Sequence, residues 1–124
     1  MIDLLYSKVT EKIRQAAFEV HKYFGCGFLE KVYENAFKYK LELLDLNVEQ
    51  QFPIPVFFID KVKVGEYVAD LVVDDKIIIE LKAISNLDKI HYAQVKNYLK
   101  VTNIKLGLLV NFRFPILQFK RIIL

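Results

Sequence analysis

Cysteine, glycine, proline and tryptophan are scarce in this chain, and each shortage narrows the class of protein. Cys26 is the single cysteine, so no disulfide can form within the chain, and one cysteine with two histidines offers no zinc cluster. Its simplest role is that of a small, buried or half-buried side chain. Four glycines and three prolines predict mostly regular structure with short connections.

Long apolar runs are also missing. No run reaches the roughly 18 to 20 residues that a membrane helix needs. The first residues carry charges and lack the apolar block and cleavage site of a signal peptide. We therefore expect a cytoplasmic protein.

Apolar residues are nevertheless abundant. They make up 54% of the 124 residues and include ten Phe and seven Tyr, which is enough for a packed interior and argues against disorder. A chain of this length has the size of one domain, so we expect a single domain over residues 1–124.

The net charge of +3 is unevenly distributed along the chain. Residues 45–80 carry eight acids and three bases, whereas residues 81–124 carry one acid and eight bases. This division suits a metal-binding pocket beside a phosphate-binding surface. It suits two ordinary solvated faces equally well.

Two amphipathic helices are predicted in the first third of the chain. Apolar side chains recur at helical spacing from about residue 3 to 24, and again from about residue 28 to 44. The second apolar stripe consists of Leu29, Tyr33, Ala36, Phe37, Leu41 and Leu44. Gly25, Cys26 and Gly27 separate the two helices, because glycine is the usual residue at a helix C-terminus.

Strand patterns follow these helices. The runs rich in β-forming residues are 52–59, 63–73, 76–84, 105–111 and 116–123. Asp60-Lys61 and Asp74-Asp75 are predicted turns between the first three runs. Pro53 and Pro55 favour an edge position for the first strand, because proline cannot donate to a sheet ladder.

A third helix lies between the third and fourth strands. We expect it to be capped by Ser85 or Asn86 and to end near Thr102. The resulting order, ααβββαββ, predicts an α/β domain with a mixed central β-sheet flanked by helices.

Two charged side chains interrupt the most apolar strand. Glu80 and Lys82 stand in a run that otherwise contains Ile, Leu and Ala. Side chains alternate along a strand, so both project on the same side, about 7 Å apart. Burying unpaired charges costs several kcal/mol, so the pair needs a compensating partner. An internal Glu–Lys salt bridge on a half-exposed face is the ordinary explanation.

Asp70 favours a different explanation. It is also a lone acid in an apolar strand, residues 67–73. If the hairpin is symmetric about Asp75, Asp70 stands opposite Glu80, with Cβ atoms roughly 5 Å apart. Opposed like charges destabilise a sheet, and a cation between them would resolve the conflict. Carboxylate oxygens suit Mg²⁺ or Mn²⁺. Lys82 could then hold an attacking water or neutralise charge on a phosphate.

Glu30 is a third acid in an apolar setting. It falls on the stripe of the second helix, in line with Phe37. Lys31, Glu34 and Lys38 are expected on the opposite, solvated face. Stabilisation of a first-turn glutamate by the helix dipole is the alternative explanation for Glu30.

The third helix carries two polar residues one turn apart, Gln94 and Tyr98. Their amide and phenol could contact a metal-bound water or a nucleic-acid backbone, although an ordinary amphipathic helix accounts for the spacing too. Basic residues around this helix are expected to form a phosphate-contacting rim near Lys82. They are Lys89, Lys96, Lys100 and Lys105.

These motifs together resemble a known family. The segment from Gly27 to Tyr33 matches the signature of the GxxExxY family, a branch of the PD-(D/E)XK nuclease superfamily. Asp70 followed by Glu80-Leu81-Lys82 resembles the D…ExK core of that superfamily. The segment from Gln94 to Tyr98 resembles the QxxxY element of its RecB-like exonuclease branch. The D…ExK pattern is weak alone, but the combination is specific and spans nearly the whole chain.

The resemblance implies a restriction-endonuclease-like core and a set of roles. Glu30, Asp70 and Glu80 would bind the divalent metal together with the backbone carbonyl of Leu81. Lys82 would assist the nucleophilic water. Gln94 and Tyr98 would support the site or the substrate strand.

Two residues near the glycine turn bear on the resemblance. Family members often have proline where this chain has Cys26, and this departure touches no expected catalytic group. His21 fits the family's histidine ahead of the turn, where a structural role is the more common one.

The expected function is hydrolysis of phosphodiester bonds in DNA by a water activated by Mg²⁺ or Mn²⁺. The alternative is a catalytically weak or inactive nucleic-acid-binding or partner module with the same fold. A binding module has no need of three carboxylates and a lysine that converge, which favours the enzyme. The small size leaves open a homodimer or a place in a larger nuclease or repair complex.

Overall fold

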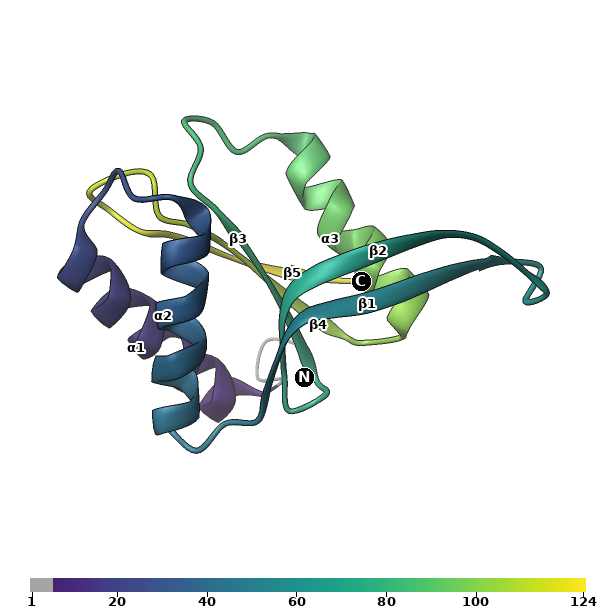
Figure 1. The fold of residues 1–124 in the computed structure, drawn as a ribbon, viewed down its shortest axis with the longest axis horizontal. Helices are drawn as coiled ribbons and strands as arrows, with labels where there is room; N and C mark the ends of the chain where they lie inside the picture. The colour runs from purple at the N-terminus through teal and green to yellow at the C-terminus, as the bar shows by residue number, and fades with distance from the viewer. Residues whose placement is uncertain (1–5) are drawn as a thin grey trace.

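The computed structural model describes residues 6–124, which form three helices and one five-stranded sheet (Figure 1). The elements are α1 (Ser7–Phe24), α2 (Glu30–Leu43), β1 (Val48–Phe58), β2 (Val62–Val73), β3 (Ile77–Lys82), α3 (Lys89–Thr102), β4 (Leu106–Asn111) and β5 (Gln118–Ile123). This order confirms the predicted ααβββαββ arrangement and the α/β fold class. Within the described range, no helix is both long enough and apolar enough to cross a membrane.

The sheet is mixed, as predicted. Its strand order is β1-β2-β3-β4-β5. β3 and β4 are parallel and are connected through α3, whereas the other neighbouring strands are antiparallel. β1, which contains Pro53 and Pro55, lies at an edge of the sheet. The proline-based expectation for this strand is confirmed.

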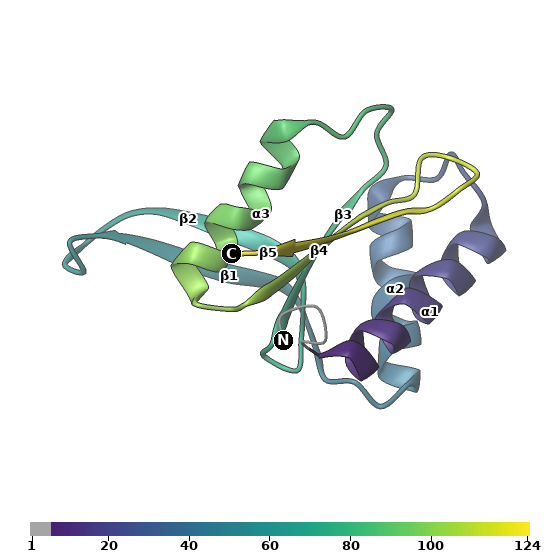
Figure 2. The same cartoon turned by 180° about the vertical axis from the view of Figure 1, so that it is seen from behind.

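Helices cover both faces of the sheet. Ile77 and Ile79 of β3 pack in a core with side chains of α1 and α2, whereas Ile78 packs in a second core with Val95 and Leu99 of α3. Figures 1 and 2 show α1 and α2 together on one side of the molecule and α3 on the other. Both faces of β3 are therefore buried. This explains why apolar and polar residues do not alternate in this strand before Glu80.

The first helix ends where the glycines predict, and the second begins later than expected. Gly25 follows α1 with φ of 70°. Residues 3–5 of the predicted first helix lie outside the described residues. The second helix begins at Glu30 rather than Phe28, because Leu29 adopts an extended conformation as its N-cap. Leu29 is therefore exposed and does not belong to the apolar stripe.

The cap of α3 was predicted wrongly. Asp88, not Ser85 or Asn86, caps the helix: its carboxylate accepts a hydrogen bond from Ile90 N–H at 3.0 Å. The physical reason lies in β4, where the Asn111 side chain accepts from Ile84 N–H and donates to Ile84 C=O. These bonds hold the chain extended beyond Lys82, so the helix begins later.

β1 also begins earlier than predicted, at Val48 rather than Phe52. Asn47 N–H donates to the Asp74 carboxylate at 2.9 Å, and Asp74 N–H donates to Asn47 C=O at 2.8 Å. The start of β1 is thereby held against the β2–β3 turn. Local β-propensity does not carry this information, because the two segments are distant in sequence.

Candidate active site

The β2–β3 hairpin has the predicted register. Leu71 pairs with Ile79, Val72 with Ile78, and Val73 with Ile77, as expected for a hairpin symmetric about position 75. Asp74 and Asp75 both have positive φ, 52° and 56°, which is the conformation of a type I′ hairpin turn. The next positions along this register are Asp70 and Glu80.

At Asp70 and Glu80 the two strands are joined by hydrogen bonds between side chain and backbone instead of by the regular backbone ladder. Asp70 N–H donates to Glu80 Oε1 at 3.1 Å, and Leu81 N–H donates to Asp70 Oδ2 at 2.8 Å. Each carboxylate therefore bonds the backbone of the opposite strand, Glu80 at Asp70 of β2 and Asp70 at Leu81 of β3. Glu80 is only 4% exposed.

β1 leaves the extended conformation at the same point. Gln50 pairs with Leu71 and Phe52 with Ala69, while Gln51 between them adopts the left-handed conformation, with φ of 53°. A non-glycine residue in this conformation costs roughly 1 to 2 kcal/mol and is found at functional sites more often than elsewhere.

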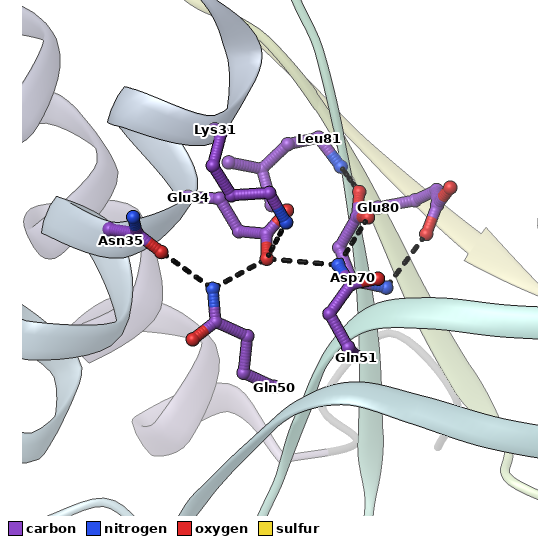
Figure 3. A network of polar contacts seen from close by, with 8 residues as sticks. All are labelled: Lys31, Glu34, Asn35, Gln50, Gln51, Asp70, Glu80 and Leu81. Atoms are coloured by element: carbon purple, nitrogen blue, oxygen red, sulfur yellow. Dashed lines mark hydrogen bonds and ion pairs between the residues drawn. The ribbon is translucent and has the colours of Figure 1, made fainter.

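Two neighbouring amide side chains of β1 reach the same carboxylate. The Nε2 atoms of Gln50 and Gln51 donate to Glu34 Oε2 at 2.6 and 2.9 Å (Figure 3). Successive side chains of a regular strand would point to opposite faces. Gln51 Nε2 also lies 3.4 Å from Asp70 Oδ1. Gln51 thus links α2 to the β2–β3 carboxylates.

Glu34 was placed wrongly by the sequence analysis. It is 2% exposed and does not lie on a solvated face. Its Oε2 also accepts from Lys31 Nζ at 3.0 Å. The signal was present in the sequence, since Glu34 lies three residues before Phe37 and seven before Leu41, on the same helical face.

Glu30 is half-buried at the first position of α2 and turns toward the site. Burial raises its pKa, the Lys82 charge and a hydrogen bond from the Ala83 backbone lower it, and the Asp70 charge raises it. The net pKa is above the ordinary glutamate value. The expectation that Glu30 faces the same region as Asp70 and Lys82 agrees with these interactions.

Asp70 and Glu80 titrate abnormally for the same reasons. Burial raises the pKa of Glu80 to about 8, with a further contribution from the Asp70 charge. Burial also raises the pKa of Asp70, against hydrogen bonding from Leu81 N–H, while the Glu34 charge raises it further. We call Glu30, Glu34, Asp70 and Glu80 the carboxylate cluster, and within it burial disfavours the charged forms of Glu30, Asp70 and Glu80.

Among the ion pairs of the described residues, Glu80 is paired with Lys82. The Nζ of this lysine lies 3.9 Å from Glu80 Oε2, at the long end of ion-pair distances, and its side chain is mostly buried. This geometry leaves the ammonium group able to contact a further anion. It also lines a pocket of about 530 Å³ with Gln94, Tyr98 and Tyr67.

Gln94 and Tyr98 form one unit in that pocket. Gln94 Nε2 donates to the Tyr98 hydroxyl at 2.9 Å. Burial and the negative charge of Glu80 raise the pKa of Tyr98 to about 12. The Tyr98 hydroxyl is therefore neutral and within electrostatic range of the carboxylate cluster.

The lysines of α3 stand apart from this pocket. Lys89, Lys96 and Lys100 are exposed, and none of them lines it. Their expected contacts with phosphates remain a prediction.

The Gly and Tyr of the GxxExxY segment build the turn that positions Glu30. Gly27 has φ of 101°, which a residue with a side chain rarely adopts. The Tyr33 hydroxyl donates to Gly25 C=O at 2.6 Å and accepts from Phe28 N–H at 3.2 Å. The Tyr33 ring stacks on Phe112 at 4.6 Å. The turn is fixed just before Glu30.

The chemistry of the carboxylate cluster fits a hard divalent cation. Glu30 of α2 lies close enough to Asp70 and Glu80 for their charges to interact, and burial disfavours the ionised form of all three carboxyl groups, a form that a bound cation would favour. As the side chains stand, no three His, Cys, Asp or Glu residues within 6–124 are arranged to hold a metal ion. Asp70 and Glu80 instead direct oxygens to backbone N–H groups.

A comparison with protein families identifies the superfamily of the chain. The family model of the PD-(D/E)XK nuclease superfamily matches residues 7–122. The chain belongs to the PD-(D/E)XK nuclease superfamily. Searches of curated proteins and of solved structures returned no significant match. The match covers every element that contributes to the carboxylate cluster, and nucleic acid is the substrate class of nucleases.

Proposed function

We propose that this PD-(D/E)XK chain is a Mg²⁺- or Mn²⁺-dependent nuclease of the GxxExxY branch that hydrolyses phosphodiester bonds in DNA. One observation carries the proposal. Glu80 accepts from Asp70 N–H, Asp70 accepts from Leu81 N–H, and Lys82 Nζ lies 3.9 Å from Glu80 Oε2. A buried and a partly buried acid beside a lysine are a costly arrangement for stability alone.

The residues of the site divide by role. Glu30, Asp70, Glu80 and the Leu81 carbonyl would hold the ion. A divalent ion there supplies charge neutralisation on the phosphate and acidifies a bound water. Lys82 Nζ orients the water or the phosphate, because it is the cation beside the acids. The Gln94–Tyr98 pair contacts the substrate strand from the pocket side.

Glu34 and Gln51 act as positioning residues. Glu34 Oε2 already accepts from Lys31, Gln50 and Gln51, so this oxygen is engaged within the protein. It holds the two glutamines of β1 in place, and Gln51 in turn lies against Asp70. Lys89, Lys96 and Lys100 supply sequence-independent phosphate contacts farther along the DNA.

A second candidate is a nucleic-acid-binding module with little or no turnover. One observation favours it: the hydrogen bonds to Asp70 N–H and Leu81 N–H give both acids a structural use. In that case the acids stay in place without a cation, and DNA binding is independent of divalent metal.

The test is a nuclease assay with Mg²⁺ or Mn²⁺ on linear, circular and structured DNA, with RNA in parallel. Lys82→Ala is the inactive control, and Lys8→Ala, which changes an exposed lysine of α1, is the matched charge control. We expect cleavage by the parent and by Lys8→Ala, and none in EDTA. If the parent and both variants bind DNA but none of them cleaves it with metal present, the binding module is favoured.

A further inference from the structure

The outer part of the β1–β2 hairpin is apolar and uncovered. Figures 1 and 2 both show this hairpin running out beyond the helices as a two-stranded arm. Large apolar side chains near its tip are between 51% and 71% exposed. They are Phe57, Phe58, Ile59, Val62 and Val64, and together they define the arm patch.

The arm patch covers both faces of the ribbon. Phe58 pairs with Val62, whereas Phe57 pairs with Lys63. Cross-strand partners share a face and successive residues alternate, so Phe57 and Phe58 project to opposite faces. A two-stranded ribbon with apolar residues on both faces is marginal in water. The arm therefore requires a partner surface.

The size of the patch fits a protein interface. With full areas of about 150 to 250 Å² for large side chains, these five residues expose on the order of 600 Å². A standard interface buries about 800 Å² on each partner. Summed over both faces of the ribbon, the arm patch amounts to about three quarters of that figure.

The charges of the arm fit a second copy of this chain. The tip carries Asp60, Lys61, Lys63 and Glu66, two acids and two bases, and Lys63 Nζ lies 3.0 Å from Glu66 Oε1. Two copies of a neutral surface do not repel each other. A nucleic-acid contact would require an excess of bases, which this arm lacks.

The prolines of β1 restrict how the copies meet. Pro53 and Pro55 pair with Val68 and Glu66 of β2, and neither has an N–H to offer at the free edge of β1. Edge-to-edge extension of the sheet is therefore blocked along this part of β1. The contact must be made by the faces and tips of the arms.

We propose that two copies of this chain form a homodimer by packing their arm patches against each other around a two-fold axis. In such an isologous contact the same patch serves both copies. The arm is continuous with β2, which carries Asp70, so the dimer sets the separation of the two carboxylate clusters. This inference does not depend on the proposed nuclease activity.

Sedimentation equilibrium of the full chain tests the proposal. The wild type should sediment with twice the chain mass of 14.6 kDa at micromolar concentrations. Phe57→Lys with Phe58→Lys should weaken dimerisation at least about thirty-fold. The control, Tyr39→Lys with Leu43→Lys, changes two exposed apolar residues of α2 and should remain dimeric. Circular dichroism should show both variants folded.

Cross-linking locates the contact. In a Cys26→Ser background, Ile59→Cys should cross-link between copies through a short bismaleimide, and Leu43→Cys on α2 should not. A monomeric wild type, or an arm variant that dimerises as well as the parent, overturns the proposal. An arm variant that loses only DNA binding also overturns it and assigns the arm to nucleic acid.

Discussion

Two buried polar clusters flank the start of α2, and they are built on opposite principles. Around Tyr33, a neutral hydroxyl meets the neutral backbone groups of Gly25 and Phe28. In the carboxylate cluster, Glu30, Asp70 and Glu80 are like charges, and burial raises the pKa of each. Every polar group has a suitable partner in the first cluster, whereas the second contains mutual repulsion.

The difference shows how the molecule separates stability from chemistry. Satisfied buried hydrogen bonds stabilise the fold, so the Tyr33 cluster holds the turn and fixes Glu30. Buried like charges destabilise it unless a cation neutralises them. Changes in the first cluster should therefore act on unfolding, and changes in the second should act on metal binding and cleavage.

The largest expected effect is the loss of cleavage in Asp70→Asn. Removing a group that stabilises charge at the reacting centre commonly lowers kcat by about 10² to 10³. Asparagine can still accept from Leu81 N–H, so the melting temperature in EDTA should be unchanged or higher. Asp75→Asn, an exposed change in the same hairpin, is the control and should cleave normally. A drop of several degrees in EDTA for Asp70→Asn would mark Asp70 as structural.

Tyr33→Phe should break the other cluster. The change leaves Gly25 C=O and Phe28 N–H without the hydroxyl, and a buried unsatisfied group costs about 1 to 3 kcal/mol. Urea denaturation in EDTA measures the loss in unfolding free energy. Tyr39→Phe, an exposed tyrosine of the same helix, should be neutral. Equal stability of the two variants would show that the Tyr33 cluster does not stabilise the turn.

The features that could be predicted from the sequence depend on patterns within one hairpin or one helix. The Asp70–Glu80 register followed from two short rules, strand alternation and a turn at Asp74-Asp75, both of which act within one hairpin. Glu30 followed from helical periodicity in the same way. These local patterns were sufficient for the fold order and for most of the candidate site.

The features missed depend on contacts between distant segments. The burial of Glu34 depends on amide donors from β1, and the left-handed conformation of Gln51 is not a preference of glutamine. The late start of α3, at Lys89, accompanies the hydrogen bonds by which Asn111 of β4 holds Ile84. Residue propensities do not encode such partners, because tertiary contacts override them.

Glu34→Gln should have an effect of intermediate size, on metal affinity. If Glu34 positions Gln51 and Asp70, metal affinity should fall about 10- to 100-fold, the range for groups that orient metal ligands. Unfolding in EDTA should change less than in Tyr33→Phe. Glu42→Gln, an exposed acid of α2, is the control for calorimetric metal binding. Full metal affinity with a large stability loss would place Glu34 with the structural cluster.

The most gradual expected effect is on the pH dependence of stability. Glu80 has a pKa raised from 4.5 to about 8, so the folded state keeps a proton that the unfolded state has lost. Stability in EDTA should thus be full below about pH 4.5 and decline as pH rises toward 8, by less than about 1.4 kcal/mol per pH unit. Glu80→Gln should flatten this decline in urea titrations, whereas Glu49→Gln, an exposed control, should not. An identical slope in wild type and Glu80→Gln would contradict the assigned titration.

Calorimetric titration of Mn²⁺ into the wild type and Glu80→Gln at pH 8 tests most directly whether the carboxylate cluster binds a divalent ion. The wild type should bind saturably. At a hundred times the Kd, the ion should add about 2.7 kcal/mol to the unfolding free energy. Glu80→Gln should show neither effect while remaining folded. Absence of binding to the wild type at millimolar Mn²⁺, or equal binding by both proteins, would contradict the account.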